Sequence, residues 1–458
     1  MKFKTINPAT EEVISEYELM PREKVIDVAK ESHDVFQEWR NLDILERASY
    51  FRNLAVVLSN KKDYYAKLMT IEMGKPLKQS LSEVEKCAWT AEFYADNASK
   101  WLEEETVQAD GKKHLIAFEP LGTILSIMPW NFPFWQAFRF GIPTLIAGNV
   151  SILKHSNVVP QCALAIEESF REAGFPEHAF ATILTDHDSI GGLITSDLIQ
   201  GVSLTGSTTA GSRIAELAGR HLKKVVLELG GSDPFIVLDD ADIDFAAKNA
   251  VTGRTINSGQ SCIAAKRFIV TNKVADKFSK KFADLMNSLI VDDPIDMKTD
   301  VGPLVNIDGL THIEGQVHDA VRNGAKILAG GKRLERKGYF YKPTVLSNVK
   351  GNMKVVTEEV FGPVAPIIIV KNEEDAIQVA NNSEFGLGAS VWTSDEDKGM
   401  KIAKRIEAGD VFINSIVKSD PRMPFGGIKK SGIGRELSKY GLKEFVNIKG
   451  INVYEHKK

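Results

Sequence analysis

The chain has 458 residues, which is too long for one hydrophobic core and suggests two or three domains. Hydrophobic residues make up 43% and charged residues 26%, and the net charge of -4 argues against nucleic acid or an anionic membrane as a partner. No apolar run approaches the roughly 18 residues of a membrane span, and no apolar signal segment follows Met1. Cys87, Cys162 and Cys262 are far apart, so we expect no disulfide framework, no metal site and a cytoplasmic protein.

Helices are predicted through the first hundred residues, because apolar residues recur there at helical spacing. These helices are expected at 22–40, 45–58, 64–73 and 80–101. From residue 114 onward, short apolar runs alternate with helical segments, which is typical of βα units on a mostly parallel sheet. The expected strands are 114–118, 123–128, 150–154, 181–184, 202–204, 225–229, 235–238, 267–270, 326–328, 364–370, 389–392 and 411–413. The helices between them are expected at 162–173, 191–194, 207–218, 243–251, 274–289, 312–323, 373–380 and 395–407.

Two α/β blocks therefore meet near Gly230, and no low-complexity linker separates them. The tail, from Glu444 to Tyr454, is predicted to be a strand. This strand completes a sheet either in the same chain or in a partner subunit.

Two segments of the first block have features of a nucleotide site. The segment Leu204–Gly211 joins a strand to a helix, where free N–H groups favour a phosphate; alternatively it is an ordinary turn capped by Ser207 or Thr208. Lys154 ends a buried strand at the carboxyl edge of the sheet, where nucleotides bind in such folds, although a surface lysine is the alternative. Residues 155–157 contain no acid, and an acid there would repel a 2′-phosphate.

Three residues have the chemistry of a covalent active site. Cys262, with the small neighbours Gly259 and Ala264, is either a reachable nucleophile or an inert buried thiol. Asn131, in the motif Pro-Trp-Asn-Phe-Pro, either stabilises an oxyanion or bonds its own backbone in a turn. Glu228 lies in an apolar strand without an adjacent partner, which is costly unless a raised pKa serves its use as a base.

Together these motifs resemble the aldehyde dehydrogenase family, and most closely its succinate-semialdehyde dehydrogenase branch, from Ile6–Thr10 to beyond Gly434–Glu436. The resemblance implies an α/β fold with a Rossmann-like cofactor domain, an α/β catalytic domain and a small β oligomerisation element. The implied boundaries are 1–103 and 122–229 for the cofactor domain, 230–435 for the catalytic domain, and 104–121 with 436–458 for the bridging element. A homodimer or homotetramer is implied as well.

The resemblance also implies a role for each site residue. The family's nucleophile falls on Cys262, its general base on Glu228 and its oxyanion amide on Asn131. A thiohemiacetal on the cysteine loses hydride to the nicotinamide, and Glu228 then activates the water that hydrolyses the thioester. The implied cofactor-binding residues are Trp130, Lys154, Ser156, Gly206, Ser207, Gly211, Leu229, Glu359 and Phe361.

The implied reaction is the NAD(P)-dependent oxidation of a small aldehyde, with succinic semialdehyde as the expected substrate. The branch places an arginine at Arg139 to hold the distal carboxylate, and an arginine fork suits that contact; the alternative is a salt bridge at a helix surface. A second arginine of some members is replaced by Ile256, and Arg254 or Arg422 can compensate. Asn157 stands where NAD-preferring members often have glutamate, so NADP is expected to be accepted, with the preference between NADP and NAD left open.

Three alternatives remain at this point. The substrate can be another aldehyde, such as lactaldehyde or a general aliphatic aldehyde. A CoA-acylating dehydrogenase would pass the same thioester to CoA, but such enzymes often lack the base glutamate, so Glu228 argues against this alternative. A non-catalytic scaffold on the same fold would have no reason to keep the cysteine, the glutamate and the asparagine together.

Overall fold

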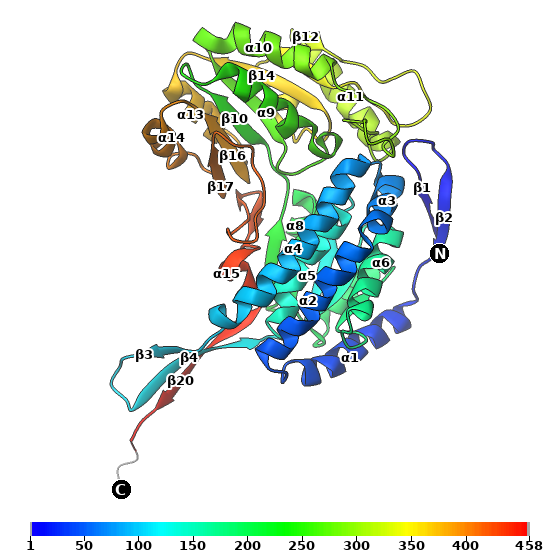
Figure 1. Cartoon of the computed structure of the whole chain (residues 1–458), viewed down its shortest axis with the longest axis vertical. Coiled ribbons are helices and arrows are strands. Elements are labelled where there is room, and N and C mark those ends of the chain that lie inside the picture. The colour runs from blue at the N-terminus through cyan, green and yellow to red at the C-terminus, as the bar shows by residue number, and fades with distance from the viewer. Residues whose placement is uncertain (1, 456–458) are drawn as a thin grey trace.

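The first sheet contains five parallel strands and one antiparallel edge strand (Figure 1). The computed structural model describes residues 2–455. The strand order is β19-β9-β8-β5-β6-β7, and only β19 runs antiparallel to its neighbour. The chain passes from β5 to β6 and β7 on one side and returns to β8 and β9 on the other. This reversal creates a switch point between β5 and β8, and such folds bind ligands beyond the carboxyl ends of strands at that point. The bounds are β5 (Thr123–Met128), β6 (Val150–His155), β7 (Phe180–Thr182), β8 (Ile199–Thr205), β9 (Lys224–Glu228) and β19 (Gly432–Ile433).

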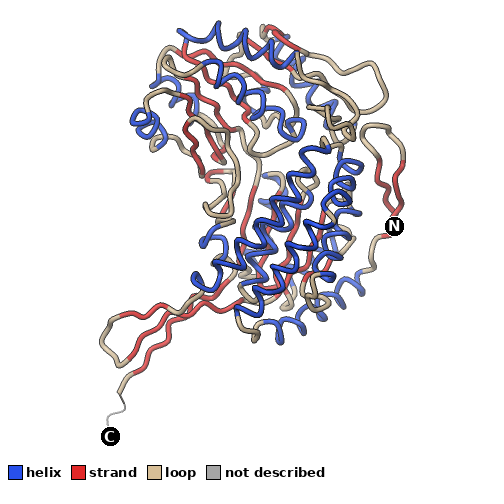
Figure 2. The backbone as a smooth tube through the Cα atoms, in the orientation of Figure 1, coloured by secondary structure: helices blue, strands red, loops and turns tan. Residues whose placement is uncertain are grey.

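Helices cover both faces of this sheet (Figures 1 and 2). α1, α7 and α8 pack on one face, while α5 and α6 pack on the other and are covered in turn by α2, α3 and α4. The bounds are α1 (Arg22–Trp39), α2 (Ile44–Asn60), α3 (Lys62–Met73), α4 (Leu77–Trp101), α5 (Pro133–Ile146), α6 (Pro160–Glu172), α7 (His187–Thr195) and α8 (Thr208–Arg220).

The helix α5 was not predicted from the sequence. All of its residues are buried. The segment is apolar through most of its length and contains Pro143, and a proline inside a segment usually indicates the end of a helix. This helix begins at Pro133, the last residue of the Pro-Trp-Asn-Phe-Pro motif, and carries Arg139 into the interior.

The second sheet has seven strands in the order β12-β13-β14-β11-β10-β16-β17, and only the β12–β13 pair is antiparallel. α9 and α10 pack on one face and α13 and α14 on the other, while α11 and α12 pack near β13 and β14. The strands are β10 (Asp233–Val237), β11 (Ala265–Thr271), β12 (Lys326–Ala329), β13 (Thr344–Ser347), β14 (Val364–Val370), β16 (Gly388–Trp392) and β17 (Asp410–Ile413). The helices are α9 (Ile243–Thr255), α10 (Asn272–Asn287), α11 (Ile307–Arg322), α12 (Lys354–Thr357), α13 (Glu373–Asn381) and α14 (Glu396–Ala403).

A three-stranded sheet, β3 (Glu105–Val107), β4 (Lys113–Pro120) and β20 (Val446–Val453), extends away from the body of the molecule (Figure 1). The predicted tail strand is therefore present, and it pairs with β4 of the same chain from Val446 opposite Pro120 to Val453 opposite Lys113. Ile448 on this strand is 63% exposed. Val107 on β3 and Val453 on β20 are each 41% exposed, so this projecting sheet exposes several apolar side chains.

Smaller elements complete the described part of the chain. The strand β13 and the hairpin β1–β2 were not predicted, and neither were several very short elements. These elements are β1 (Lys2–Ile6), β2 (Val13–Glu18), β15 (Phe385–Gly386), β18 (Ile428–Lys429), the 3-10 turn η1 (Ile256–Gly259) and α15 (Ser438–Leu442). Within residues 2–455, no helix combines the length and the apolar character needed to cross a bilayer.

Candidate active site

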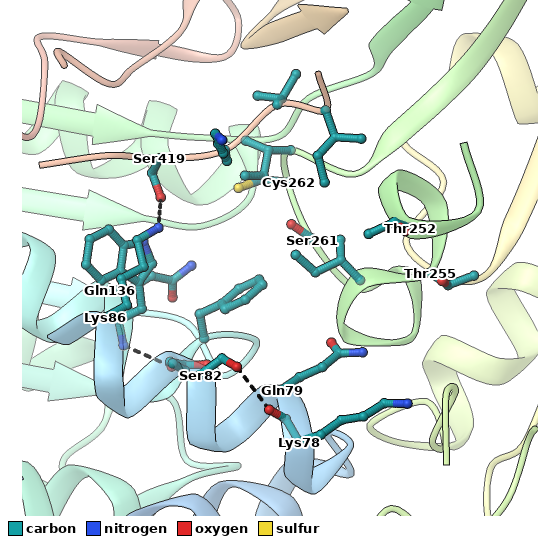
Figure 3. Close-up of a pocket in the computed structure, with 18 of the residues that line it drawn as sticks. Lys78, Gln79, Ser82, Lys86, Gln136, Thr252, Thr255, Ser261, Cys262 and Ser419 are labelled. Carbon is teal, nitrogen blue, oxygen red and sulfur yellow. Dashed lines mark hydrogen bonds between the residues drawn. The ribbon is translucent and has the colours of Figure 1, made fainter. Parts of the chain in front are cut away.

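Cys262 lies where two cavities meet. The larger cavity, of about 440 Å³, is bounded by α4, α5, α9 and the segment before Phe425 (Figure 3). The smaller cavity, of about 270 Å³, lies at the carboxyl edge of the first sheet. Cys262 and Gln136 line both cavities. Cys262 is partly exposed, whereas Cys87 and Cys162 are buried. Of the three cysteines, Cys262 is therefore the one placed to react.

The smaller cavity is built from segments that follow strands of the first sheet. Because β5, β8 and β9 are parallel, their carboxyl ends meet at one edge, and motifs that are distant in sequence converge there. A segment before β14 in the second half of the chain completes the wall, where the Trp130 and Phe361 rings meet edge-on at 5.7 Å. The predicted site residues that line this cavity are Trp130, Asn131, Gly206, Ser207, Leu229, Glu359 and Phe361.

The turn after β8 places a helix N-terminus at this cavity. Ser207 is the N-cap of α8, and its hydroxyl oxygen accepts a hydrogen bond from the Ala210 N–H at 3.2 Å. Gly211 lies in the first turn of the helix, and a Cβ on it would come within 2.4 Å of Leu229 Cδ2. Glycine therefore allows Leu229 to pack against α8. The capped turn and the phosphate-type turn that the sequence left as alternatives are combined in one structure, because capping leaves other N–H groups of the first turn free.

The end of β6 lies beside the end of β5 and holds three further polar residues. Lys154 is buried, has no ion-pair partner in the described part of the chain, and has a pKa lowered by burial. The Ser156 hydroxyl accepts from the Val158 N–H at 3.3 Å. The buried Oδ1 of Asn157 has no hydrogen-bond partner among residues 2–455. None of these three residues lines the smaller cavity itself.

The loop before Cys262 has an unusual backbone. Asn257, Ser258 and Gly259 have φ values of 51°, 56° and 80°, which place all three in the left-handed region. Such strain costs roughly 1–3 kcal/mol per non-glycine residue and persists only where surrounding contacts enforce it. The Asn257 N–H donates to Gln79 of α4 at 2.7 Å, and its amide donates to the Asn131 carbonyl at 2.6 Å.

Contacts from other segments fix the rest of this loop. The Arg254 guanidinium donates to the Gly259 carbonyl at 2.7 Å. A Cβ on Gly259 would come within 2.3 Å of the Gly362 backbone. Arg254 is fully buried and its guanidinium binds the backbone of this loop, so Arg254 is not placed to bind the substrate.

The Asn131 side chain is oriented by two hydrogen bonds. Its amide donates to the Gln260 carbonyl at 3.0 Å, and its side-chain oxygen accepts from the Gln136 amide at 3.0 Å. A primary amide has two N–H donors, so one N–H of Asn131 remains available at the cavity beside Cys262. The alternative, a turn in which the Asn131 side chain bonds its own backbone, does not match these contacts.

Glu228 ends β9 as a buried carboxyl group. Neither of its side-chain oxygens has a hydrogen-bond partner among the described residues. Burial raises its pKa well above the usual value, and the nearby Glu436 raises it further, while Arg139 and Arg435 lower it. Glu228 lies close enough for its charge to raise the pKa of Cys262. A carboxyl group kept uncharged by its surroundings is suited to proton transfer nearer neutral pH.

A buried lysine contacts the backbone at the cysteine. The Lys266 ammonium donates to the carbonyl oxygens of Ser261 at 3.0 Å and Cys262 at 2.5 Å. It also lies 3.2 Å from a carboxylate oxygen of Glu359, which accepts from the Gly231 N–H as well. Burial raises the pKa of Cys262 to about 11, and Lys266 opposes that shift more than any other neighbouring charge.

Comparison with known proteins identifies this arrangement. The sequence profile described as "Aldehyde dehydrogenase family" matches residues 1–451. The chain belongs to the aldehyde dehydrogenase family. A Synechocystis protein named "Probable succinate-semialdehyde dehydrogenase [NADP(+)]" is 49% identical over 454 residues, covering 98% of this chain and 99% of that protein. A Mycobacterium leprae protein named "Succinate-semialdehyde dehydrogenase [NADP(+)]" is 44% identical over the same shares of both chains.

Solved structures of the same family have the same fold. The Streptococcus pyogenes succinic semialdehyde dehydrogenase in complex with NADP+ is 37% identical, covers 99% of this chain and 100% of its own, and gives a TM-score of 0.97. A Burkholderia pseudomallei succinate-semialdehyde dehydrogenase gives the same TM-score of 0.97 at 34% identity, with 99% and 95% coverage. The α/β fold inferred from the sequence is confirmed.

The two arginines predicted to bind substrate have different surroundings in this aldehyde dehydrogenase. Arg139 lines the larger cavity, but it is buried and forms an ion pair with Glu436, and it donates to the Thr205 hydroxyl at 3.3 Å. Arg422 does not line that cavity; its exposed guanidinium forks onto Asp420 at 2.8 and 2.6 Å. Neither charge is free of a carboxylate partner within the chain.

Three residues around the site were not predicted from the sequence. Gln136 lies on α5, the helix that contains Pro143 and was not predicted, and Lys266 lies beside Arg267 in a strand that is buried throughout. Lys86 follows the helical pattern of α4, and a lysine there usually faces solvent. The apolar setting of Lys266 was the one available signal, because a charge in a buried strand requires partners.

Proposed function

We propose that this chain oxidises succinic semialdehyde to succinate with NADP(+) as the hydride acceptor. The observation that carries the proposal is the position of Cys262 between two cavities, one at the switch point of a dinucleotide-type sheet and the other large enough for a small aldehyde. The names of the relatives support the substrate and the cofactor.

The residues at the carboxyl edge of the first sheet fit NADP. The free N–H groups in the first turn of α8, directly after Gly206 and Ser207, suit a phosphate. Lys154 supplies a buried positive charge that has no ion-pair partner among the described residues, and Asn157 presents no negative charge to a 2′-phosphate. The residues that would hold the rest of the cofactor are Trp130, Ser156, Gly211, Leu229, Glu359 and Phe361. When bound, NADP accepts a hydride ion from the substrate carbon.

Cys262 acts as the nucleophile in this proposal. Its thiolate attacks the aldehyde carbon and forms a thiohemiacetal, whose oxyanion accepts hydrogen bonds from the Asn131 amide and the Cys262 N–H. Gln136 positions Asn131 for this contact. One such donor is worth about 10²–10³ in rate. After oxidation the acyl group remains on Cys262 as a thioester.

Glu228 acts as the general base for hydrolysis. Its carboxylate takes a proton from water, which attacks the thioester, releases succinate and restores the Cys262 thiol. A general base contributes typically about 10²–10⁴ in rate. Arg139 and Glu436 form a buried ion pair beside Glu228, which fits a role in holding the base rather than the substrate.

We also propose the domain and subunit organisation that the resemblance implies. Residues 1–103 and 122–229 bind the cofactor, and 230–435 carry the nucleophile. Segments 104–121 and 436–458 bridge subunits of a homodimer or homotetramer, although β19 within 230–435 joins the first sheet. The exposed Ile448 on β20 supports the bridging role.

A substrate panel tests the proposed function. Purified enzyme is given succinic semialdehyde, lactaldehyde and butanal, each with NADP or NAD and with or without CoA, and reduced cofactor is followed by absorbance. We expect the highest kcat/KM with succinic semialdehyde and NADP, without a need for CoA. Turnover only with CoA would favour acyl transfer, a higher kcat/KM for another aldehyde would reject the substrate, and no turnover of any aldehyde would reject the enzyme.

A further inference from the structure

The larger cavity contains a half-buried cation that no carboxylate in the described part of the chain neutralises. Of the three other cations in its wall, Lys78 pairs with Asp300 at 2.7 Å, Arg139 pairs with Glu436, and Lys418 is exposed to solvent. Lys86, on α4, has no ion-pair partner within residues 2–455. A positive charge that is partly removed from water and left unpaired is costly unless a ligand supplies the counter-charge.

The carboxylates near Lys86 are engaged elsewhere. Glu83 pairs with the buried Lys75 and accepts hydrogen bonds from the N–H groups of Phe134 and Trp135 at 3.0 and 2.9 Å. Asp420 is held by the fork of Arg422, as described above. These arrangements leave the charge of Lys86 directed at the cavity.

The contacts of Lys86 orient its ammonium group. Its Nζ donates to the Ser419 hydroxyl at 2.7 Å and lies 3.9 Å from the centre of the Trp135 ring (Figure 3). An ammonium group has three N–H donors, and the Ser419 hydroxyl that accepts from it keeps its own O–H free to donate. Burial and the nearby Arg139 lower the pKa of Lys86 to about 8, which is the response expected of a cation without its counter-charge.

We propose that Lys86, together with the Ser419 hydroxyl, binds the distal carboxylate of the substrate in the larger cavity and thereby sets the preference for a carboxylated aldehyde. Cys262 faces the same cavity, so one small molecule bound there can contact both Cys262 and Lys86. The intervening wall includes Phe132 and Phe425, which suit the methylene groups of such a substrate. The inference rests on the proposed function, because it assumes that the aldehyde is carboxylated.

The test compares Lys86→Met with the wild-type enzyme on succinic semialdehyde and on butanal, which has the same four-carbon chain without the carboxylate. Charged hydrogen bonds predict that KM for succinic semialdehyde rises about 10- to 100-fold, while KM for butanal changes less than about 2-fold. Lys86→Arg should recover part of the loss. Lys100→Met, on the same helix at an exposed position, is the matched control and should change neither value.

Succinate binding to the enzyme without cofactor gives a second readout, measured by titration calorimetry. We expect Lys86→Met to weaken it by a factor similar to the change in KM. If Lys86→Met does not fold, both measurements are made on Ser419→Ala instead, for which we expect smaller changes in KM and in succinate affinity. Equal effects on the two aldehydes, or a selective effect in Arg139→Met alone, would overturn the inference. A wild-type enzyme that does not favour succinic semialdehyde over butanal would instead reject the proposed function.

Discussion

Replacing Lys266 tests how the reactivity of Cys262 is controlled. The Lys266 ammonium contacts the carbonyl oxygens of Ser261 and Cys262 and lies 3.2 Å from Glu359. In Lys266→Gln the side chain keeps an N–H donor but loses the positive charge. The thiolate then loses its strongest stabilising charge, and the carboxylate of Glu359 is no longer neutralised. Both changes favour the protonated thiol, so the pKa of Cys262 should rise.

The expected size follows from the environment of the thiol. The pKa of Cys262 is about 11, so only about 1% of it is thiolate at pH 9. An opposite charge in direct proximity shifts a pKa by roughly 1–3 units. Loss of the charge should therefore reduce the thiolate fraction at a given pH by about 10-fold or more. Each unit of change in the pKa corresponds to about 1.4 kcal/mol.

Alkylation by iodoacetamide measures this change directly. The inactivation rate of the enzyme without cofactor is followed across alkaline pH, and mass spectrometry confirms that the label is on Cys262, since Cys87 and Cys162 are buried. The rate profile of Lys266→Gln should move to higher pH. Lys280→Gln, an exposed position on α10, serves as the control. A wild-type profile in Lys266→Gln, with the fold shown intact by thermal unfolding, would refute the electrostatic reasoning.

Three further variants test the assigned roles. Cys262→Ala should abolish aldehyde oxidation while calorimetry still detects NADP binding; retained turnover would place the nucleophile elsewhere. Glu228→Gln should produce one equivalent of NADPH per site in a rapid burst, followed by a steady rate reduced about 10²–10⁴-fold, because hydrolysis loses its base; an unchanged steady rate would exclude that role. Asn157→Glu should raise KM for NADP about 10-fold or more through repulsion of the 2′-phosphate and leave KM for NAD nearly unchanged, and equal changes in both would contradict the placement of the phosphate.

The residues that the sequence located well are those whose signal is local. Asn131, Gly206 and Glu228 each lie at or directly after the end of a strand, and parallel strands necessarily end at one edge of a sheet. Strand endings can be inferred from short apolar runs, so the convergence of these motifs followed from the order of elements alone. The helix α5 is largely apolar and contains Pro143, which usually indicates the end of a helix, so this helix was missed and Gln136 with it.

The charge environment of a residue depends on partners that local sequence does not reveal. Arg139 was expected to bind a carboxylate, and it does contact one, but the carboxylate belongs to Glu436, which is distant in the chain. Lys86 lies in an ordinary helical pattern, so the sequence did not mark it, yet the nearby carboxylates Glu83 and Asp420 pair with other cations and Lys86 has no ion-pair partner among residues 2–455. The residue type was informative about chemistry, while the distribution of partners decides which residue is available to a ligand.

The same reasoning explains why the segment around Cys262 was a weak signal on its own. Asn257 and Gly259 tolerate a left-handed backbone and Ser258 adopts it at a cost, but none of the three residue types requires it. The conformation is enforced by Gln79 from the first half of the chain and by the close approach of Gly362 from the second. The nucleophile is thus positioned by both sheets at once, and a change in either half of the chain that loosens these contacts should displace the sulfur without altering any residue that touches the substrate.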